Sequence, residues 1–416
     1  MQPAQHNDRE RRPQADTAAG PATASRRYSP VPNSRRARRA LIGAGTALAV
    51  VVGATYAATW IMDIPSPHEL IRLENTPPSK RGEVFPARTI AAGKPTELPK
   101  SSQPTPKQVP WKGKQIPFEE FLAKTHTQSF AILREGKLTY EWYHDGVNAN
   151  TRLSSWSMAK SIVSLLVGQA IERGELRESD RLVDLLPELR SGGAYDTVTV
   201  QHLLDMSSGV DVAEDHDTIF TGSTRMYLTH DLPGFLKDHR KVTYPPGSKA
   251  TYRSVDTGLL GLILTRIENK PLADVLSERV WKPMGATHTA TWNLDRDGGM
   301  EKAFAGINAT TLDYAKIGQL VLDKGQANGQ QIVPEKWVTR LATPAANRID
   351  GWGYSAQWWH PSGGNGKDYS AIGVHGQYTY IDPVTKTVIV KLSDHGVEED
   401  EQETIDAMRS IAQHTT

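Results

Sequence analysis

Residues 157–174 read SMAKSIVSLLVGQAIERG, and the interpretation of the chain starts from this stretch. Its apolar residues recur at the three- and four-residue spacing of an α-helix. Gly174 is typical of a position where a helix ends. We therefore expect a helix from Ser157 to Arg173. One stripe of this helix would face a core, formed by Ile162, Leu165, Leu166 and Ala170.

Ser157 and Lys160 lie three residues apart at the start of this helix, so their side chains share one face. A serine hydroxyl is a weak nucleophile until a base takes its proton, and a desolvated lysine can help to do so. Backbone N–H groups at a helix N-terminus also point toward a developing oxyanion. The pattern indicates a serine nucleophile. The alternative is a solvated helix end that holds both residues by chance.

β-prone runs flank this helix at both ends of the chain. Residues 129–133 and 138–143 are joined by the turn sequence REGK, which is typical of a hairpin. Residues 370–381 and 387–393 are two later runs, and a helical segment follows at 401–413. The middle of the chain alternates helical stretches with loops. This order predicts an α+β fold, in which distant segments complete one antiparallel sheet flanked by helices, with an inserted helical subdomain.

Residues 40–62 carry no charge and are long enough to cross a bilayer as one helix. Arginines at positions 35, 36, 38 and 39 directly precede them, so the positive-inside rule places the N-terminus in the cytoplasm and the rest of the chain outside. We predict an uncleaved membrane anchor. A cleaved signal peptide, with Ala57 and Ala58 near the processing site, is the alternative, but the preceding tail and the apolar run are long for one. A buried soluble helix fits less well, because the run has no polar face.

The anchor divides the chain into four predicted parts. Residues 1–39 form a basic, disordered cytoplasmic tail, and residues 40–62 form the transmembrane anchor. Residues 63–115 are rich in proline and predict an extended spacer, parts of which pack on the domain. Residues 116–416 form the catalytic domain.

Composition excludes several classes of function. The chain has 48 Lys+Arg against 47 Asp+Glu, which gives no reason to expect a nucleic-acid partner. It contains no cysteine, so disulfides, thiolate metal sites and a cysteine nucleophile are excluded. A Gly-x-Ser-x-Gly elbow, a His-Glu-x-x-His motif and a phosphate-binding loop are all absent from the sequence. The oligomeric state is left open.

Further motifs follow the Ser-x-x-Lys helix in a fixed order, and together they resemble the serine β-lactamase and penicillin-binding superfamily. The resemblance covers about residue 128 to the C-terminus and is strongest to the class C β-lactamase and esterase branch. It implies a β-lactamase/transpeptidase-like fold. The matching segments are VTVQHLLDMSSGV at 198–210, PPGS at 245–248, YRS at 252–254, GLLG at 258–261, WKPMGA at 281–286 and TTLDYA at 310–315.

The resemblance implies that Tyr252 is the general base that activates Ser157. A free tyrosine has a pKa near 10, so we expect Lys160 to lower the pKa of Tyr252. The alternative is that Tyr252 is a half-buried tyrosine of the core with no catalytic role. Ser254 stands where the family usually has Asn, which puts the partner of the substrate amide in doubt.

The third motif of the family is Lys-Thr-Gly on the strand beside the site. We place its counterpart at residues 374–376, where Gly376 lets the substrate approach and the N–H of Gln377 joins that of Ser157 in the oxyanion hole. The motif lysine, which suits a substrate carboxylate, is missing. His375 either replaces the missing lysine in part or has a structural role. The difference favours an esterase or amidase, and the nylon-oligomer (6-aminohexanoate-dimer) hydrolases match best.

Weaker candidates complete the list. The acidic run 214–217 has no familiar metal-ligand spacing and is expected to be an exposed loop, which could attract an amine-bearing substrate if it lies beside the pocket. Tyr227 could add a hydroxyl near the site. No metal or organic cofactor is expected. Three tryptophans could line a cleft or belong to the core: Trp352, Trp358 and Trp359.

The sequence predicts hydrolysis of a small ester or amide through an acyl-enzyme on Ser157. Three rivals remain. A penicillin-binding protein or β-lactamase acting on the cell wall is favoured by the anchor and disfavoured by the missing lysine. A β-lactam sensor is disfavoured, because the short predicted cytoplasmic tail contains no effector domain. An inactive binding module conflicts with the intact set of Ser157, Lys160 and Tyr252.

Overall fold

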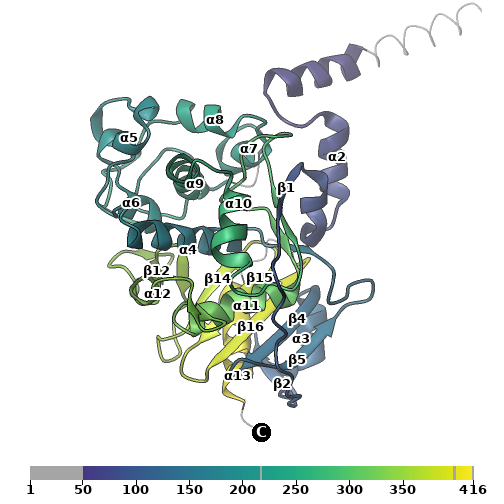
Figure 1. The fold of residues 1–416 in the computed structure, drawn as a ribbon. Helices are drawn as coiled ribbons and strands as arrows, with labels where there is room; N and C mark the ends of the chain where they lie inside the picture. Colours follow the sequence, from purple (N-terminus) through teal and green to yellow (C-terminus); the bar gives the residue numbers. More distant parts are fainter. Residues whose placement is uncertain (1–49, 216–217, 397–399, 415–416) are drawn as a thin grey trace, which may run out of the picture. The chain divides into compact units, whose positions relative to one another are not determined.

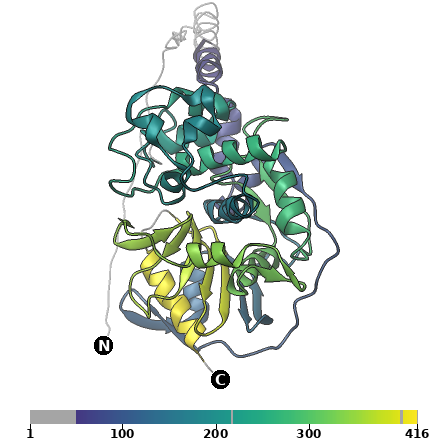
Figure 2. The same cartoon turned by 60° about the vertical axis from the view of Figure 1, so that its left-hand side comes forward.

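An eight-stranded antiparallel sheet forms the centre of the fold, in the order β11-β12-β13-β14-β15-β16-β4-β5 (Figure 1). The structure is a computed structural model that describes residues 50–215, 218–396 and 400–414. β4 (Thr127–Arg134) and β5 (Lys137–Tyr143) form the predicted hairpin. β16 (Thr387–Ser393) pairs with β4, so the yellow C-terminal strands lie beside the blue N-terminal ones (Figure 2). The prediction that distant segments complete one sheet is confirmed.

Alternate residues of the sheet face two cores, because successive side chains of a strand point to opposite faces. On β4, Ala131 and Leu133 join the core that contains α4 (Met158–Glu172) and α11 (Thr311–Leu322). Phe130 and Ile132 join the core that contains α3 (Phe118–Lys124) and α13 (Glu401–Gln413). Helices therefore cover both faces of the sheet, as predicted.

The helical part lies between the hairpin and the C-terminal strands in sequence and packs on α4. Its longest helix is α9 (Ser254–Glu268), which contacts both α4 and α6 (Val200–Leu204). This confirms the predicted helical insertion. The other helices of this part are α5 (Leu182–Leu185), α7 (Gly222–Leu228), α8 (Leu232–Asp238) and α10 (Leu272–Leu276), with α12 (Glu335–Leu341) later in the chain.

The predicted single run 370–381 is two strands. β14 (Tyr369–Gly373) and β15 (Gln377–Asp382) pair with each other across a tight turn. His375 and Gly376 have φ values of 67° and 82°, a left-handed conformation that reverses the chain. Three short strands complete this edge of the sheet: β11 (Arg348–Ile349), β12 (Trp352–Ser355) and β13 (Trp358–His360).

Much of the predicted spacer is folded, and this corrects the boundary at residue 116. One compact unit begins at Tyr56. β1 (Ala87–Ile90) pairs with β7 (Ala290–Asn293) in a second sheet of order β1-β7-β8-β6. Proline blocks a long helix but not a short edge strand, which explains the error. Further elements are α2 (Pro67–Asn75), the 3₁₀-helix η1 (Pro78–Val84), β2 (Gln108–Trp111), β3 (Lys114–Pro117), β6 (Leu153–Ser154), β8 (Ile307–Ala309) and the small hairpin of β9 (Gln326–Ala327) and β10 (Gln330–Gln331).

The predicted anchor is described only in part. Residues 1–39 and the first ten residues of the anchor, 40–49, lie outside the described residues, whereas residues 50–61 are helical. Within the described ranges, no helix has the length and apolar character needed to cross a bilayer. The tail and the anchor at 40–62 therefore stay predictions.

Candidate active site

Ser157 and Lys160 meet at the N-terminus of α4. Ser157 is the residue directly before the helix, and the Nζ of Lys160 lies 2.7 Å from its Oγ. The same Nζ donates to the carbonyl of Phe304 at 2.9 Å. Lys160 is almost fully buried, and this burial lowers its pKa to about 8. Part of the amine, about a tenth at pH 7, is thus neutral and able to accept a proton, compared with less than a thousandth for an ordinary lysine.

Tyr252 completes a cluster with these two residues. Its hydroxyl lies close enough to Ser157 for that residue to affect its pKa, and the Nζ of Lys160 lies 5.0 Å from the centre of its ring. However, burial and the nearby Glu214 raise the pKa of Tyr252 far above its usual value. The predicted lowering by Lys160 is wrong, because desolvation of the phenolate outweighs the cation. Of the two candidate bases, Lys160 has the pKa suited to the role.

Ser254 does not offer its hydroxyl to a substrate in this structure. Its backbone N–H and its hydroxyl donate to the two carboxylate oxygens of Glu214, each at 2.7 Å. Glu214 is partly buried and lies at the start of α9, so it is not the exposed residue that we expected. His216 and Asp217, from the same acidic run, lie outside the described residues. Among the described residues no group of acidic or histidine side chains could hold a metal ion.

The strand that approaches Ser157 does so at Gly373, not at Gly376. A β-carbon at Gly373 would lie 2.5 Å from the carbonyl oxygen of Ser155 and 3.0 Å from the nitrogen of Ser157. A β-carbon at Gly376 would instead meet Ser393 and its neighbours. The predicted motif is therefore displaced along the chain by three residues, and Ala371-Ile372-Gly373 occupies its place.

The displacement changes the roles predicted for His375 and Gln377. Gln377 pairs with Gly373 on the next strand, and its buried side chain holds the backbone of Ser393. His375 lies in the turn, where its Nδ1 is 3.1 Å from the carbonyl oxygen of His395. The backbone N–H that follows the close glycine belongs to Val374. The signal in the sequence that points to this position is Gly373 itself, three residues before Gly376.

Two pairs of stacked aromatic rings include neighbours of the nucleophile. Trp156, directly before Ser157, stacks on Tyr227 with ring centres 5.6 Å apart. Tyr252 stacks on Trp359 at 5.2 Å. Tyr227 is thus near the site, as suggested, although burial raises the pKa of its hydroxyl well above its usual value. Of the other two tryptophans, Trp352 packs edge-on against Trp359, and Trp358 is fully buried in the core.

The η1 segment holds Trp156 in place. Trp156 has φ of 46°, which is uncommon for a bulky residue and costs energy. Its indole N–H donates to the carbonyl of Pro78 at 3.0 Å, and the guanidinium of Arg81 lies 6.0 Å from the ring centre. The segment that we predicted to be a spacer therefore forms part of the wall beside Ser157. Its proline content hid this role from sequence analysis.

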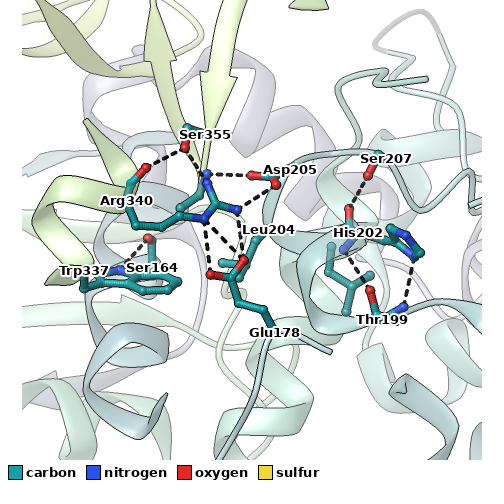
Figure 3. Close-up of polar contacts among 12 residues, drawn as sticks. Ser164, Glu178, Thr199, His202, Leu204, Asp205, Ser207, Trp337, Arg340 and Ser355 are labelled. Atoms are coloured by element: carbon teal, nitrogen blue, oxygen red, sulfur yellow. Dashed lines mark hydrogen bonds and ion pairs between the residues drawn. The ribbon is translucent and has the colours of Figure 1, made fainter. Parts of the chain in front are cut away.

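A partly buried ion-pair network fixes the helical part against the sheet (Figure 3). Arg340 on α12 pairs with Glu178 at 2.9 Å and with Asp205, at the end of α6, at 2.7 Å. Asp205 also accepts the backbone N–H of Ala356, just beyond β12, at 3.0 Å. Met206 follows directly, and the Thr251 N–H donates to its carbonyl. The network therefore supports the loop that carries Tyr252.

The chain is similar to several known proteins. A family model described as beta-lactamase matches residues 118–413. A 6-aminohexanoate-dimer hydrolase from Paenarthrobacter ureafaciens is 29% identical over 298 residues, which cover 66% of this chain and 74% of that protein. Penicillin-binding protein 4 from Amycolatopsis lactamdurans is 24% identical over 244 residues, which cover 51% of this chain and 62% of that protein.

Solved structures extend the comparison to the fold. A structure from Bacillus anthracis, also named as a 6-aminohexanoate-dimer hydrolase, has a TM-score of 0.72 at 25% identity. The match covers 79% of this chain and 91% of that protein. A family VIII carboxylesterase has a TM-score of 0.56 at 16% identity, with 68% and 91% covered. These likenesses confirm the predicted β-lactamase/transpeptidase-like fold.

Proposed function

This chain belongs to the beta-lactamase family, whose model matches it from residue 118 to residue 413, and on that premise we propose that it is a serine hydrolase that cleaves an ester or amide bond through an acyl-enzyme on Ser157. One observation carries the proposal: the buried amine of Lys160 lies 2.7 Å from the Ser157 hydroxyl at the start of a helix. Ser157 is partly exposed, and the amine of Lys160 is held against its hydroxyl by a second hydrogen bond to the Phe304 carbonyl, which is the arrangement that an activated nucleophile needs.

In the proposed acylation step, the Oγ of Ser157 attacks the substrate carbonyl carbon while its proton passes to the neutral amine of Lys160. The carbonyl electron pair moves onto its oxygen. When the tetrahedral intermediate collapses, the Tyr252 hydroxyl gives a proton to the leaving group and regains one from Lys160. Water then repeats the sequence on the acyl-enzyme, with Lys160 again as the acceptor.

We assign the oxyanion hole to two backbone N–H groups. One is that of Ser157, at the N-terminus of α4, where the helix dipole also favours negative charge. The other is that of Val374, because Gly373 is the residue that approaches Ser157. Loss of one such donor typically costs about 10²–10³-fold in kcat.

The surroundings support a small amide or ester as the substrate. The two stacked ring pairs, Trp156–Tyr227 and Tyr252–Trp359, suit the apolar part of a short linear chain. At Ala371-Ile372-Gly373 there is no lysine to pair with the carboxylate of a β-lactam. Since a relative is named for hydrolysis of a 6-aminohexanoate dimer, linear amides are the first class to test.

A cell-wall or β-lactam-directed activity is the second candidate, favoured by the similarity to a penicillin-binding protein. The two are separated by incubating the protein with a fluorescent penicillin and, separately, with a short-chain p-nitrophenyl ester. Ester turnover without a lasting penicillin adduct supports the esterase or amidase. A stable adduct at Ser157 by mass spectrometry, without ester turnover, overturns it in favour of the cell-wall or sensor class.

We further propose that residues 40–62 anchor the protein in a membrane, with the N-terminus in the cytoplasm and the catalytic domain outside. The charge-free run and the arginines before it support this location. The full chain should stay with the membrane fraction after an alkaline wash. Release into the wash, or a mature chain that begins near residue 59, would instead indicate a cleaved signal peptide.

A further inference from the structure

Glu214 lies inside the catalytic cluster, although nothing in the Ser-x-x-Lys chemistry requires a carboxylate there. Both of its oxygens accept hydrogen bonds at 2.7 Å, one from the backbone N–H of Ser254 and one from its hydroxyl. Ser254 is two residues after Tyr252. A single carboxylate thus ties the 211–215 loop to the segment that presents Tyr252 to Ser157.

The location explains why an acidic side chain is stable at this point. Ser254 begins α9, a helix of 15 residues, whose first N–H groups have no partner within the helix. A carboxylate there satisfies one of these donors and interacts favourably with the helix dipole. The hydroxyl of Ser254 supplies the second donor, so the residue that replaces the family's Asn is committed to Glu214.

Glu214 also acts on Lys160 through its negative charge. Lys160 is surrounded by the Ser157 hydroxyl, the Phe304 carbonyl and the Tyr252 ring, none of which is charged. Glu214 is the carboxylate that raises the pKa of Lys160 and so offsets part of the effect of burial.

Two further charged groups lie near this cluster, both at the start of α9. Asp256 is fully buried and accepts a hydrogen bond from the Ser208 hydroxyl, and burial raises its pKa to about 8, so it is mainly protonated at neutral pH. Arg253 donates to the carbonyls of Val210 and Val212, in the strand leading to Glu214. Glu214 is thus the carboxylate of this cluster that is directed at the catalytic segment.

We propose that Glu214 is a positioning residue for the serine hydrolase: its carboxylate holds the Tyr252–Ser254 segment beside Ser157 and stabilises the Lys160 ammonium that forms when Ser157 loses its proton. The inference rests on the proposed function. The Oγ–H bond of Ser157 breaks, the proton moves to Lys160 Nζ, and Glu214 keeps its charge throughout. It exchanges no proton and touches no reacting atom.

The test is the pH dependence of ester turnover in Glu214→Gln, which keeps the size of the side chain and removes its charge. Because Glu214 raises the pKa of Lys160, the rising limb of kcat/KM should move to lower pH in this variant. Without the charge of Glu214, Lys160 is a weaker base, and the ammonium that it forms in the reaction is less stabilised. The plateau of kcat should therefore fall roughly tenfold, with little change in KM. Glu214→Asp, which retains the charge, should recover most of the wild-type profile.

Two matched variants separate charge from support. Ser254→Ala removes one hydrogen bond and leaves the carboxylate, so it should lower kcat while leaving the rising limb in place. Glu335→Gln removes an exposed carboxylate from the first turn of α12 and should change neither quantity. Thermal denaturation of each variant checks that the fold is kept.

Two results distinguish failure of this inference from failure of the proposed function. If Glu214→Gln changes KM for an amine-bearing ester but leaves the pH profile and kcat unchanged, Glu214 binds substrate and the inference is overturned. If the wild-type protein forms no adduct at Ser157 and turns over no ester or amide, the proposed function itself fails.

Discussion

Among the residues that the structure describes, two buried lysines, Lys160 and Lys391, lie within hydrogen-bond distance of a serine hydroxyl, and only one of the two pairs has the surroundings of a catalytic site. Lys160 lies 2.7 Å from the Ser157 hydroxyl, and Lys391 on β16 lies 2.5 Å from that of Ser393. Burial lowers the pKa of both lysines, to about 8 for Lys160 and about 7 for Lys391. By distance and by protonation alone, the second pair is as good as the first.

The difference lies in what surrounds each serine. Ser393 is fully buried, its backbone is held by Gln377, and the rings of Phe121 and Tyr378 lie 5.9 Å from Lys391. Ser157 is partly exposed and opens a helix. A substrate can therefore reach Ser157 and find backbone donors there. Ser393 cannot be reached by a substrate, and it does not lie at the N-terminus of a helix. Nucleophilic catalysis needs the approach path and the oxyanion donors as much as the base.

Replacing each serine by alanine gives the largest contrast between the two pairs. Ser157→Ala removes the nucleophile, so ester turnover should fall by about 10⁴-fold or more, with no adduct detected by mass spectrometry. Ser393→Ala removes only a buried hydroxyl and should leave kcat/KM within about threefold while lowering stability by about 1 kcal/mol. Surviving turnover in Ser157→Ala, or its loss in a folded Ser393→Ala variant, would reverse the assignment of the two pairs.

The pH dependence of turnover should follow Lys160. In the free enzyme kcat/KM should rise with pH and level off above about 8, because Lys160 accepts a proton only in its neutral form. Lys160→Arg keeps a cation that does not deprotonate, and should lower kcat/KM by roughly 10³-fold at all pH values. A profile that instead rises only above pH 10 would return the role of base to Tyr252.

Substitution of the two glycines tests the position of the oxyanion strand. Gly373→Ala places a methyl group 2.5 Å from the Ser155 carbonyl, so the start of α4 has to shift, and kcat/KM should fall about 10²-fold. Gly376 has a φ of 82°, which alanine adopts only with strain, so Gly376→Ala should cost about 1 kcal/mol of stability with little change in turnover. The opposite ranking of the two kcat/KM values would restore Gly376 and Gln377 as the oxyanion segment.

Local sequence patterns predicted the parts of this site that depend on local structure. The apolar spacing after Ser157 defined α4, and a helix fixes the distance from Ser157 to Lys160. The hairpin and β16 followed from β-prone runs in the same way. Tyr252 was found through the order of motifs rather than through any local pattern.

The parts that sequence analysis missed depend on contacts between distant segments. Glu214 reaches Ser254 across 40 residues of chain, and Pro78 reaches Trp156 across 78. No periodicity marks such a contact. The pKa of Tyr252 was predicted in the wrong direction for the same reason, since its main cause is burial by residues that are remote in sequence.

The smallest effect on turnover is expected for Lys391→Met, which instead changes stability. In the folded chain the pKa of Lys391 is about 7, below its ordinary value of 10.5, so between these two pH values the unfolded chain binds a proton that the folded chain lacks. Lys391 therefore destabilises the fold fully below pH 7, and this cost disappears as the pH rises toward 10.5. Removing the amine should stabilise the protein by about 1–3 kcal/mol at pH 7, after the loss of one hydrogen bond.

Urea unfolding of wild type and Lys391→Met at several pH values measures this difference. The advantage of the variant should shrink steadily from pH 7 to pH 10.5, while kcat/KM stays near that of wild type. Lys324→Met, at a lysine that is 70% exposed, is the matched control and should show no such pH dependence. If Lys391→Met were instead less stable than wild type by the same amount at every pH, the pKa of Lys391 would not be lowered by folding. Burial of a lysine beside a serine would then not by itself indicate an amine that can accept a proton at neutral pH.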